Sequence, residues 1–190
     1  MYHYYHRKSH TLHHIKTNHP EDPDTFAMGE FWEVFLIKTP WSLINQLNGV
    51  QLYQACDHLK LTPFERRWTW IMYGLNLALL IGLVATGYGW ELLMLWLVPW
   101  FVGELIMEVT FGWFPHHDSS ETGRYRDTRI SLFPGADILF LYQNHHLIHH
   151  MLPAVPFYRY RAVFDELRPS LEAQGARIEG FWPYSKPTAS

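Results

Sequence analysis

The sequence predicts an all-α integral membrane protein, and two observations lead to this fold class. The first is a pair of long apolar segments, residues 68–90 and 92–114, each about as long as a bilayer is thick. The second is a set of histidine clusters that lie outside these segments and have the spacing of helical faces. Nothing along the 190 residues suggests a linker, so a single domain over residues 1–190 is expected.

The two apolar segments are expected to form one transmembrane hairpin, residues 68–114. At about 1.5 Å of rise per residue, a helix of about 20 residues spans the bilayer core. Both segments are apolar on all sides, which favours membrane spans over the alternative, a helical hairpin buried in a soluble protein. The aromatic content of 17% also fits the aromatic belts that membrane proteins place at the bilayer surface.

The basic residues predict the orientation of the hairpin. All 15 Lys and Arg lie before residue 68 or after residue 114. The positive-inside rule therefore places both termini and the histidine clusters in the cytoplasm. The net charge of −3 gives no electrostatic reason to expect nucleic acid as a partner, and the single cysteine, Cys56, excludes an internal disulfide or a multi-cysteine metal site.

The segments outside the hairpin complete the predicted organisation. Residues 1–30 carry the first histidine cluster. Residues 31–67 mix bulky apolar and polar side chains, which predicts interfacial helices broken near Pro40, with a soluble amphipathic helix as the alternative. Residues 115–190 form a cytoplasmic region that carries the last cluster and ends in a short amphipathic helix and an irregular tail.

Most of the 13 histidines fall into three clusters, HRKSHTLHH at residues 6–14, FPHH at 114–117 and NHHLIHH at 144–150. The spacing His-x-x-His-His occurs in the first and the last cluster. On a helix these positions lie within an arc of about 100°, so each triplet can aim its imidazoles at one point. A metal-free surface cluster is the alternative, and the repeated spacing beside a membrane hairpin argues against it.

The number of clustered histidines indicates a metal site. Neutral imidazole binds iron, copper, zinc and nickel. Three histidines would satisfy one catalytic zinc, but six or seven exceed what one ion can hold, which favours two metals. In a membrane protein, iron can use O2 to oxidise an unactivated C–H bond of a lipid, although residue types alone leave copper and zinc open.

Two longer motifs resemble the histidine boxes of the membrane fatty acid desaturase superfamily. HRKSHTLHHIKTNHPEDPD, residues 6–24, resembles its second box, and NHHLIHHMLPAVPFYRY, residues 144–160, resembles its third. The stretches FPHH and RYRDTRI are more similar to bacterial beta-carotene hydroxylase-like members. The resemblance implies a desaturase-like fold with a non-haem diiron centre, two iron ions at the cytoplasmic face. It also implies O2-dependent desaturation or hydroxylation of a fatty acyl chain or a carotenoid ring.

The resemblance also implies site residues and partners. The motif positions correspond to seven metal ligands: His10, His13, His14, His116, His146, His149 and His150. His145 stands where the motif usually has an aromatic residue, so it is not counted. Asn144 is a candidate for orienting a metal-bound water or a ligand histidine, with a helix-capping role as the alternative. Because the sequence contains no haem, flavin or iron-sulfur motif, an external electron donor such as ferredoxin is expected.

One part of the family's pattern has no counterpart. The first box, a histidine pair on an earlier membrane helix, is missing, because the second box begins within ten residues of Met1. His6 and His10 have a suitable spacing, but His10 already belongs to the second box. We therefore expect an N-terminally incomplete desaturase-like chain. The alternative to an enzyme is a truncated, non-catalytic metal-binding membrane remnant of this family.

Two acidic residues, Glu104 and Glu108, lie inside the second apolar segment. An ionised carboxylate costs about 2.5 to 3.5 kcal/mol near the bilayer centre, so such residues are functional candidates. Their shared helical face could line a substrate tunnel or bond to a polar end group such as a carotenoid hydroxyl. The alternative is that they are protonated or paired with a neighbouring helix.

A charged stretch follows the hairpin, with Arg124, Arg126 and Arg129 among Glu121 and Asp127. This mixture is typical of a solvated loop. The alternative is a docking patch for an acidic electron carrier.

Overall fold

The computed structural model describes residues 3–46 and 48–180. Helices dominate this part of the chain, as the predicted fold class requires. One small parallel sheet, in which β1 (Arg129–Ser131) pairs with β2 (Arg177–Glu179), is the exception among the described residues. The N-terminal region holds α1 (His3–Lys16), η1 (Thr25–Ala27), α2 (Phe31–Glu33), η2 (Val34–Lys38), α3 (Thr39–Gln46) and α4 (Gly49–His58).

Two long apolar helices follow and confirm the predicted spans. The first is α5 (Pro63–Ala85), which begins at a capping box between Thr62 and Glu65. The second runs without interruption over Gly89–His116. Its parts are α6 (Gly89–Leu92), η3 (Leu93–Leu97), α7 (Val98–Met107), η4 (Glu108–Trp113) and α8 (Phe114–His116). Both are long and apolar enough to cross a membrane, and only 6% of each apolar stretch is buried.

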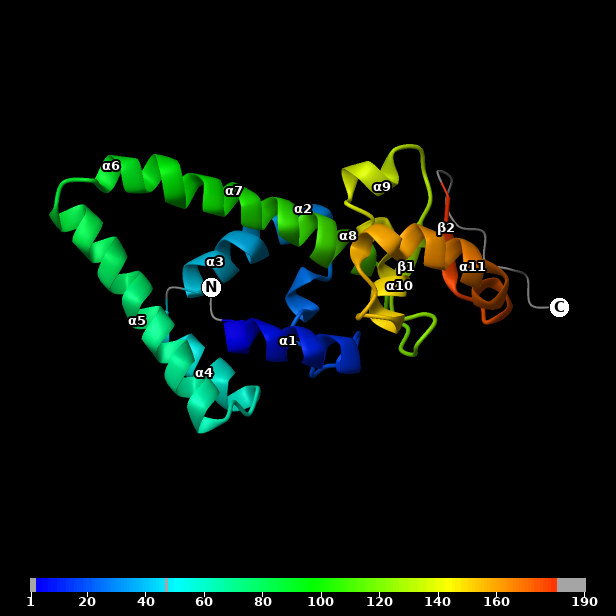
Figure 1. Ribbon diagram of the computed structural model, residues 1–190, viewed down its shortest axis with the longest axis horizontal. Helices are drawn as coiled ribbons and strands as arrows, with labels where there is room; N and C mark the ends of the chain where they lie inside the picture. Colours follow the sequence, from blue (N-terminus) through cyan, green and yellow to red (C-terminus); the bar gives the residue numbers. More distant parts are fainter. Residues whose placement is uncertain (1–2, 47, 181–190) are drawn as a thin grey trace.

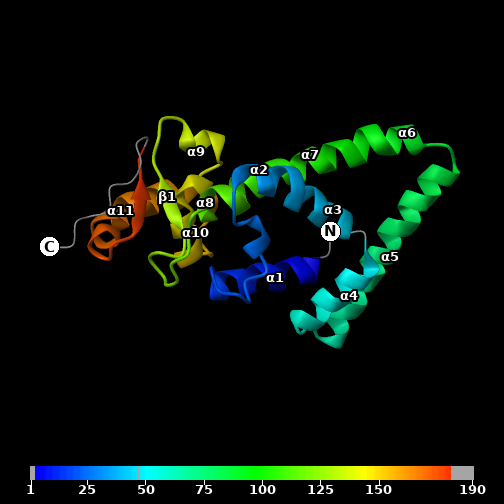
Figure 2. The same cartoon turned by 180° about the vertical axis from the view of Figure 1, so that it is seen from behind.

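The hairpin is splayed. The two spans meet at the short turn between α5 and α6 and then diverge, so that α1 and α3 lie between their far ends (Figure 1). The view from behind shows the same triangular outline, with α8 leading from the second span into the C-terminal region (Figure 2). The second span therefore delivers its last residues directly to the histidine-bearing helices.

Wide π-helical turns precede prolines in three places. Segments η2, η3 and η4 end within two residues of Pro40, Pro99 and Pro115, respectively. A proline removes one backbone hydrogen bond and its ring crowds the carbonyl four residues earlier, and a wider turn at that point relieves the clash. The expected helix break near Pro40 is therefore wrong, because α2, η2 and α3 form one continuous helix.

That helix has a strongly apolar exposed face. Its exposed large side chains are Trp32, Leu36, Ile37, Trp41 and Ile44. Such a face suits a helix that lies in the bilayer interface. The interfacial position of residues 31–67 stays a prediction.

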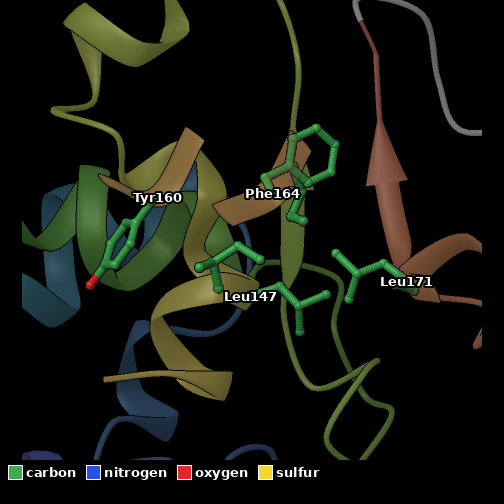
Figure 3. Close-up of a cluster of buried hydrophobic side chains, with 7 residues drawn as sticks. Leu147, Tyr160, Phe164 and Leu171 are labelled. Atoms are coloured by element: carbon green, nitrogen blue, oxygen red, sulfur yellow. The ribbon is translucent and has the colours of Figure 1, made fainter. Parts of the chain in front are cut away.

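The C-terminal region has its own core. Its elements are β1, α9 (Ala136–Leu139), η5 (Gln143–His145), α10 (His146–Met151), η6 (Phe157–Arg159), α11 (Tyr160–Ala173) and β2. Leu147 on α10 packs against Tyr160, Phe164 and Leu171 of α11 (Figure 3). Because Leu147 and Ile148 are fully buried on this side, the histidines of α10 are turned to the opposite side. The expected amphipathic helix is α11, whereas strand β2 was not expected, and residues 181–190 lie outside the described part.

Candidate metal centre

The structure brings all seven predicted ligand histidines together from α1, α8 and α10. They form two adjoining groups. Within each group, one ring nitrogen from each histidine lies within 4.8 Å of those of the others. The four-histidine group consists of His13, His116, His146 and His150, and the three-histidine group consists of His10, His14 and His149. The two groups are in contact, since the rings of His14 and His150 are stacked with centroids 4.4 Å apart.

The three-histidine group has the tighter geometry. The Nε2 atom of His10 lies 3.0 Å from that of His14, and the Nε2 atom of His149 lies 3.1 Å from each. Nitrogens that bind one ion at about 2.1 Å and at right angles are separated by about 3.0 Å. The three atoms therefore fit one triangular face of an octahedron around a single metal ion.

The four-histidine group is buried. His13, His116 and His146 are each less than 5% exposed. Both ring nitrogens of His116 and Nε2 of His150 have no hydrogen-bond partner within the described ranges. Buried polar atoms are ordinarily satisfied, so these unpartnered nitrogens indicate a ligand for them, and a metal ion fits the chemistry of a nitrogen lone pair.

The helices divide their triplets between the groups. Helix α1 contributes His10 and His14 to one group and His13 to the other, and α10 contributes His146 and His150 to one and His149 to the other. The expectation that each triplet aims at one point is thus corrected. Neighbouring helix residues project about 100° apart, so the i and i+4 rings share one target and the i+3 ring takes the next.

Hydrogen bonds to oxygen atoms fix the Nδ1 atoms of four ligand histidines, three in the four-histidine group and one in the three-histidine group. The Nδ1 atom of His13 lies 2.9 Å from Oδ1 of Asp22, and Nδ1 of His146 lies 3.1 Å from Oε1 of Gln143. Each Nδ1–H donates to an oxygen, so Nε2 of each ring is left as the metal-binding atom.

The remaining two supporting contacts involve hydroxyl groups. The Nδ1 atom of His150 lies 3.3 Å from the hydroxyl of Thr17, and Nδ1 of His149 lies 2.8 Å from that of Tyr160. Thr17 donates its own proton to the carbonyl of His13, so it accepts from His150. The Tyr160 ring packs in the core beside α10 while its hydroxyl points out of the cluster (Figure 3).

Electrostatics keep most of these imidazoles neutral. Burial, reinforced by neighbouring imidazoles, lowers the pKa of His14 to about 3 and that of His149 to about 4. Burial also holds the pKa of His146 and of His150 well below the usual value. Metal binding requires the deprotonated ring, so these side chains are ready to bind at neutral pH.

His13 differs from the other histidines. Burial alone would lower its pKa, but the hydrogen bond to Asp22 and the charges of Asp24, Asp22 and Asp127 raise the pKa overall. Asp24 lies close to this pair, with Oδ2 3.6 Å from Nδ1 of His13. The acidic side chains therefore concentrate negative charge beside the four-histidine group, which favours a cation there.

Asn144 and His145 are placed outside both groups. The side-chain amide of Asn144 donates to the carbonyl of Ser131 and to Oδ1 of Asp137, over 3.1 and 2.9 Å. His145 bonds to the same Asp137 oxygen over 3.0 Å. Asn144 therefore ties η5 to β1 and α9, and its described hydrogen bonds do not reach a predicted ligand. His145, which was not predicted as a ligand, belongs to neither histidine group.

The charged loop is not a continuous basic surface. Arg129 is 2% exposed and pairs with Glu179 over 3.2 Å, so it cannot belong to a docking patch or a solvated loop. Arg126 pairs with Glu121 over 3.3 Å. Arg129 is buried because β2 pairs with β1, and this strand pairing was not predicted.

Four supporting residues were missed in the sequence. They are Asp22, Thr17, Gln143 and Tyr160. Gln143 lies three residues before its ligand His146, so local spacing could have suggested it, whereas Thr17 contacts His150 of a separate helix. Asp22 and Tyr160 reach their histidines through a turn and a separate helix, and only the tertiary structure reveals those contacts.

The predicted Glu104 and Glu108 both line a cavity of about 540 Å³. It lies among α1, α3, α4 and the second span, and Asp24 also lines it. Because Asp24 approaches His13, the cavity adjoins the metal centre.

Comparison with protein families matched the fatty acid desaturase family over residues 1–182. Searches of curated proteins and of solved structures gave no match. The match covers nearly the whole chain, including both histidine motifs and both spans. The chain therefore belongs to the fatty acid desaturase family.

Proposed function

We propose that this protein is an O2-dependent non-haem diiron oxidoreductase that desaturates or hydroxylates a membrane lipid. Family membership supports the general class, a lipid-modifying oxidoreductase in a membrane. The observation that carries the finer proposal is the convergence of three Nε2 atoms within 3.1 Å beside a second, buried group of four histidines. Two such groups in contact fit two metal ions rather than one.

Iron fits the donor set. All seven donors are imidazole nitrogens. The right-angle spacing of the nitrogens in the three-histidine group suits octahedral coordination, a geometry that iron accepts. When bound, a pair of iron ions supplies the oxidising power to remove hydrogen from an unactivated C–H bond, with O2 and two external electrons. The members of this family are known for binding iron, which agrees with this choice.

The chain's own residues hold and shield the centre. Asp22, Gln143, Thr17 and Tyr160 fix the tautomers and ring directions of four ligands, as outer hydrogen-bond partners do in other metal sites. Burial of the four-histidine group excludes bulk water from one side. Exclusion of water protects a reactive oxidant from side reactions.

The balanced reactions need a reductant that this chain does not hold. Hydroxylation converts R–H, O2, two electrons and two protons into R–OH and one water. Desaturation uses the same inputs to convert CH2–CH2 into CH=CH and two waters. We therefore propose an external donor such as ferredoxin on the cytoplasmic side, the side that the positive-inside rule favours for the histidine centre.

A feeding experiment tests the proposal. A host that expresses the chain together with a ferredoxin and its reductase receives carotene or isotope-labelled fatty acids, and products are identified by mass spectrometry. An oxidised or unsaturated product that disappears in His149→Ala, but not in His58→Ala, supports the enzyme. His58 is a suitable control because it lies on α4, outside both groups. Iron-loaded protein that yields no product from either substrate class favours the non-catalytic alternative.

A further inference from the structure

The cavity beside the metal centre has two chemically different walls. Its apolar wall includes Trp41 and Leu43 of α3 and Leu52 and Ala55 of α4. Its acidic wall includes Glu104 and Glu108 of the second span together with Asp24. A volume of about 540 Å³ is within the range of small-molecule sites, and the two walls suit a molecule with an apolar body and a polar end.

The acidic wall is structured. The indole N–H of Trp100 donates to Oε1 of Glu104 over 3.2 Å, which orients that carboxyl group. The carboxyl group of Glu108 folds over Gly112, where a Cβ atom would overlap its Oε1 atom. The glycine therefore allows the Glu108 side chain to take its position. Two carboxyl groups held in this way offer several hydrogen-bond acceptors to the cavity.

A buried hydroxyl gives independent evidence for a polar ligand. Thr39 also lines the cavity and is 3% exposed, yet its Oγ1 atom has no hydrogen-bond partner within residues 3–46 and 48–180. Leaving a buried hydroxyl unpaired costs about 1 to 3 kcal/mol, so a ligand that bonds to it is favoured.

The one lysine of the lining is already engaged. Lys38 donates to the carbonyl of Met28 over 2.7 Å and pairs with Glu33 over 3.4 Å. The lining residues thus offer three acidic side chains and one engaged lysine, so a carboxylate or a phosphate meets no free lysine or arginine there, and a group that donates hydrogen bonds is favoured.

We propose that this cavity binds the polar end of a lipid that carries a hydrogen-bond donor without negative charge, a hydroxyl or an amine, and discriminates against free fatty acids. The inference rests on the proposed lipid oxidation, because it names the substrate class of the same centre. Glu104 and Glu108 accept from the end group, Thr39 supplies a further polar contact, and the apolar wall holds the adjacent hydrocarbon. Asp24 links this cavity to the histidine centre through His13.

A quenching assay tests the proposal directly. The full chain in nanodiscs is titrated with three brominated lipids of equal chain length, a primary alcohol, a primary amine and a carboxylic acid, and tryptophan fluorescence is recorded. Bromine quenches nearby indoles, and subtraction of the Trp41→Phe signal isolates the quenching of Trp41 from that of the other tryptophans. Because Trp41 is also exposed, quenching by a brominated alkane of equal length without a polar end group is subtracted as the contribution of the bilayer. The alcohol or the amine is expected to bind at least tenfold more tightly than the acid, and comparison of these two arms identifies the end group.

Two variants test which cavity residues set the preference for the alcohol or the amine. Thr39→Val is expected to weaken the preferred ligand by about fivefold to tenfold, the size of one hydrogen bond. The double variant Glu104→Gln/Glu108→Gln removes negative charge and is expected to abolish discrimination against the acid. Thr110→Val and Glu91→Gln are matched controls outside the cavity, because Thr110 bonds to its own helix and Glu91 lies near the connecting turn.

The outcomes separate this inference from the proposed function. Equal binding of the acid and the alcohol, or unchanged selectivity in the double Gln variant, overturns the inference. Iron content and lipid oxidation are measured on the same samples. Intact oxidation without selectivity refutes the inference alone, whereas selective binding by a protein that holds no iron refutes the proposed function alone.

Discussion

The two histidine groups differ in how the protein supports them. The four-histidine group draws on α1, α8 and α10, is mostly buried, and has hydrogen-bond partners in Asp22, Gln143 and Thr17. The three-histidine group draws on α1 and α10 only, has one exposed and two half-buried side chains, and has its described outer support at Tyr160. The four-histidine group is therefore part of the packed fold, whereas the three-histidine group is partly open to solvent.

Openness at the three-histidine group has a chemical reason. An octahedral ion bound by three nitrogens on one face keeps its opposite face free for other ligands. The second cavity, of about 600 Å³, is lined by His14 and His150 together with polar residues of the loop that includes Thr122 and Arg124. It gives small polar molecules a route to the histidines that does not pass through the apolar wall of the first cavity.

Loss of a buried ligand is expected to have the largest effect. His146→Ala should abolish product formation and remove about one of two bound irons, because His146 lies at the buried group and is fixed by Gln143. Iron is measured by plasma emission spectrometry on purified protein. Retention of full iron content in His146→Ala, with His58→Ala as the control, would contradict the assignment of this group.

A chelator should remove iron from the two histidine groups at different rates. A membrane-impermeant ferrous chelator added to the loaded protein is expected to remove the iron of the exposed group quickly and that of the buried group slowly, at least tenfold apart. Absorbance of the chelate follows the release. A single phase that accounts for all the iron would show that the two groups do not differ in access.

Removal of the acidic support should weaken the buried group. Asp22→Asn is expected to lower iron affinity there by about 10-fold to 100-fold, because the His13 ring loses its charged hydrogen-bond acceptor. Competition with a chelator of known affinity measures the change. Asp165→Asn is the control, since Asp165 pairs with Arg161 on the exposed side of α11. Equal affinities in the two variants would refute the role of Asp22.

Removal of the Tyr160 hydroxyl is expected to have the smallest effect. Tyr160→Phe keeps the ring in the core and should lower iron affinity about 10-fold at the three-histidine group alone. Thermal unfolding should be nearly unchanged. Tyr158→Phe, at an exposed position, serves as the control. If Tyr160→Phe lost iron from the slowly released group instead, the hydroxyl of Tyr160 would not support the three-histidine group.

Helical periodicity predicted much of this architecture. Apolar segments of bilayer length identified both spans, and repeated histidine spacing identified six of the seven residues that converge, while the family resemblance added His116. Both signals are local, since they depend on residues within a few turns of one helix. Periodicity could not assign His13 and His149 to opposite groups, because the division depends on how α1 and α10 face each other.

Other features depend on contacts between distant segments. The burial of Arg129 follows from pairing between β1 and β2, which lie more than forty residues apart in sequence. The continuity of the helix through Pro40 depends on a wider turn before it, which propensity arguments do not anticipate. Sequence patterns therefore predicted which residues carry the chemistry better than which residues support them.

Mössbauer spectroscopy of the purified protein, loaded anaerobically with iron-57, tests the central claim most directly. We expect about two irons per chain at two distinguishable sites, with the loss of one signal in His149→Ala and of the other in His146→Ala. A single site, or two signals that both persist in each variant, would contradict the claim that these histidines hold a pair of iron ions.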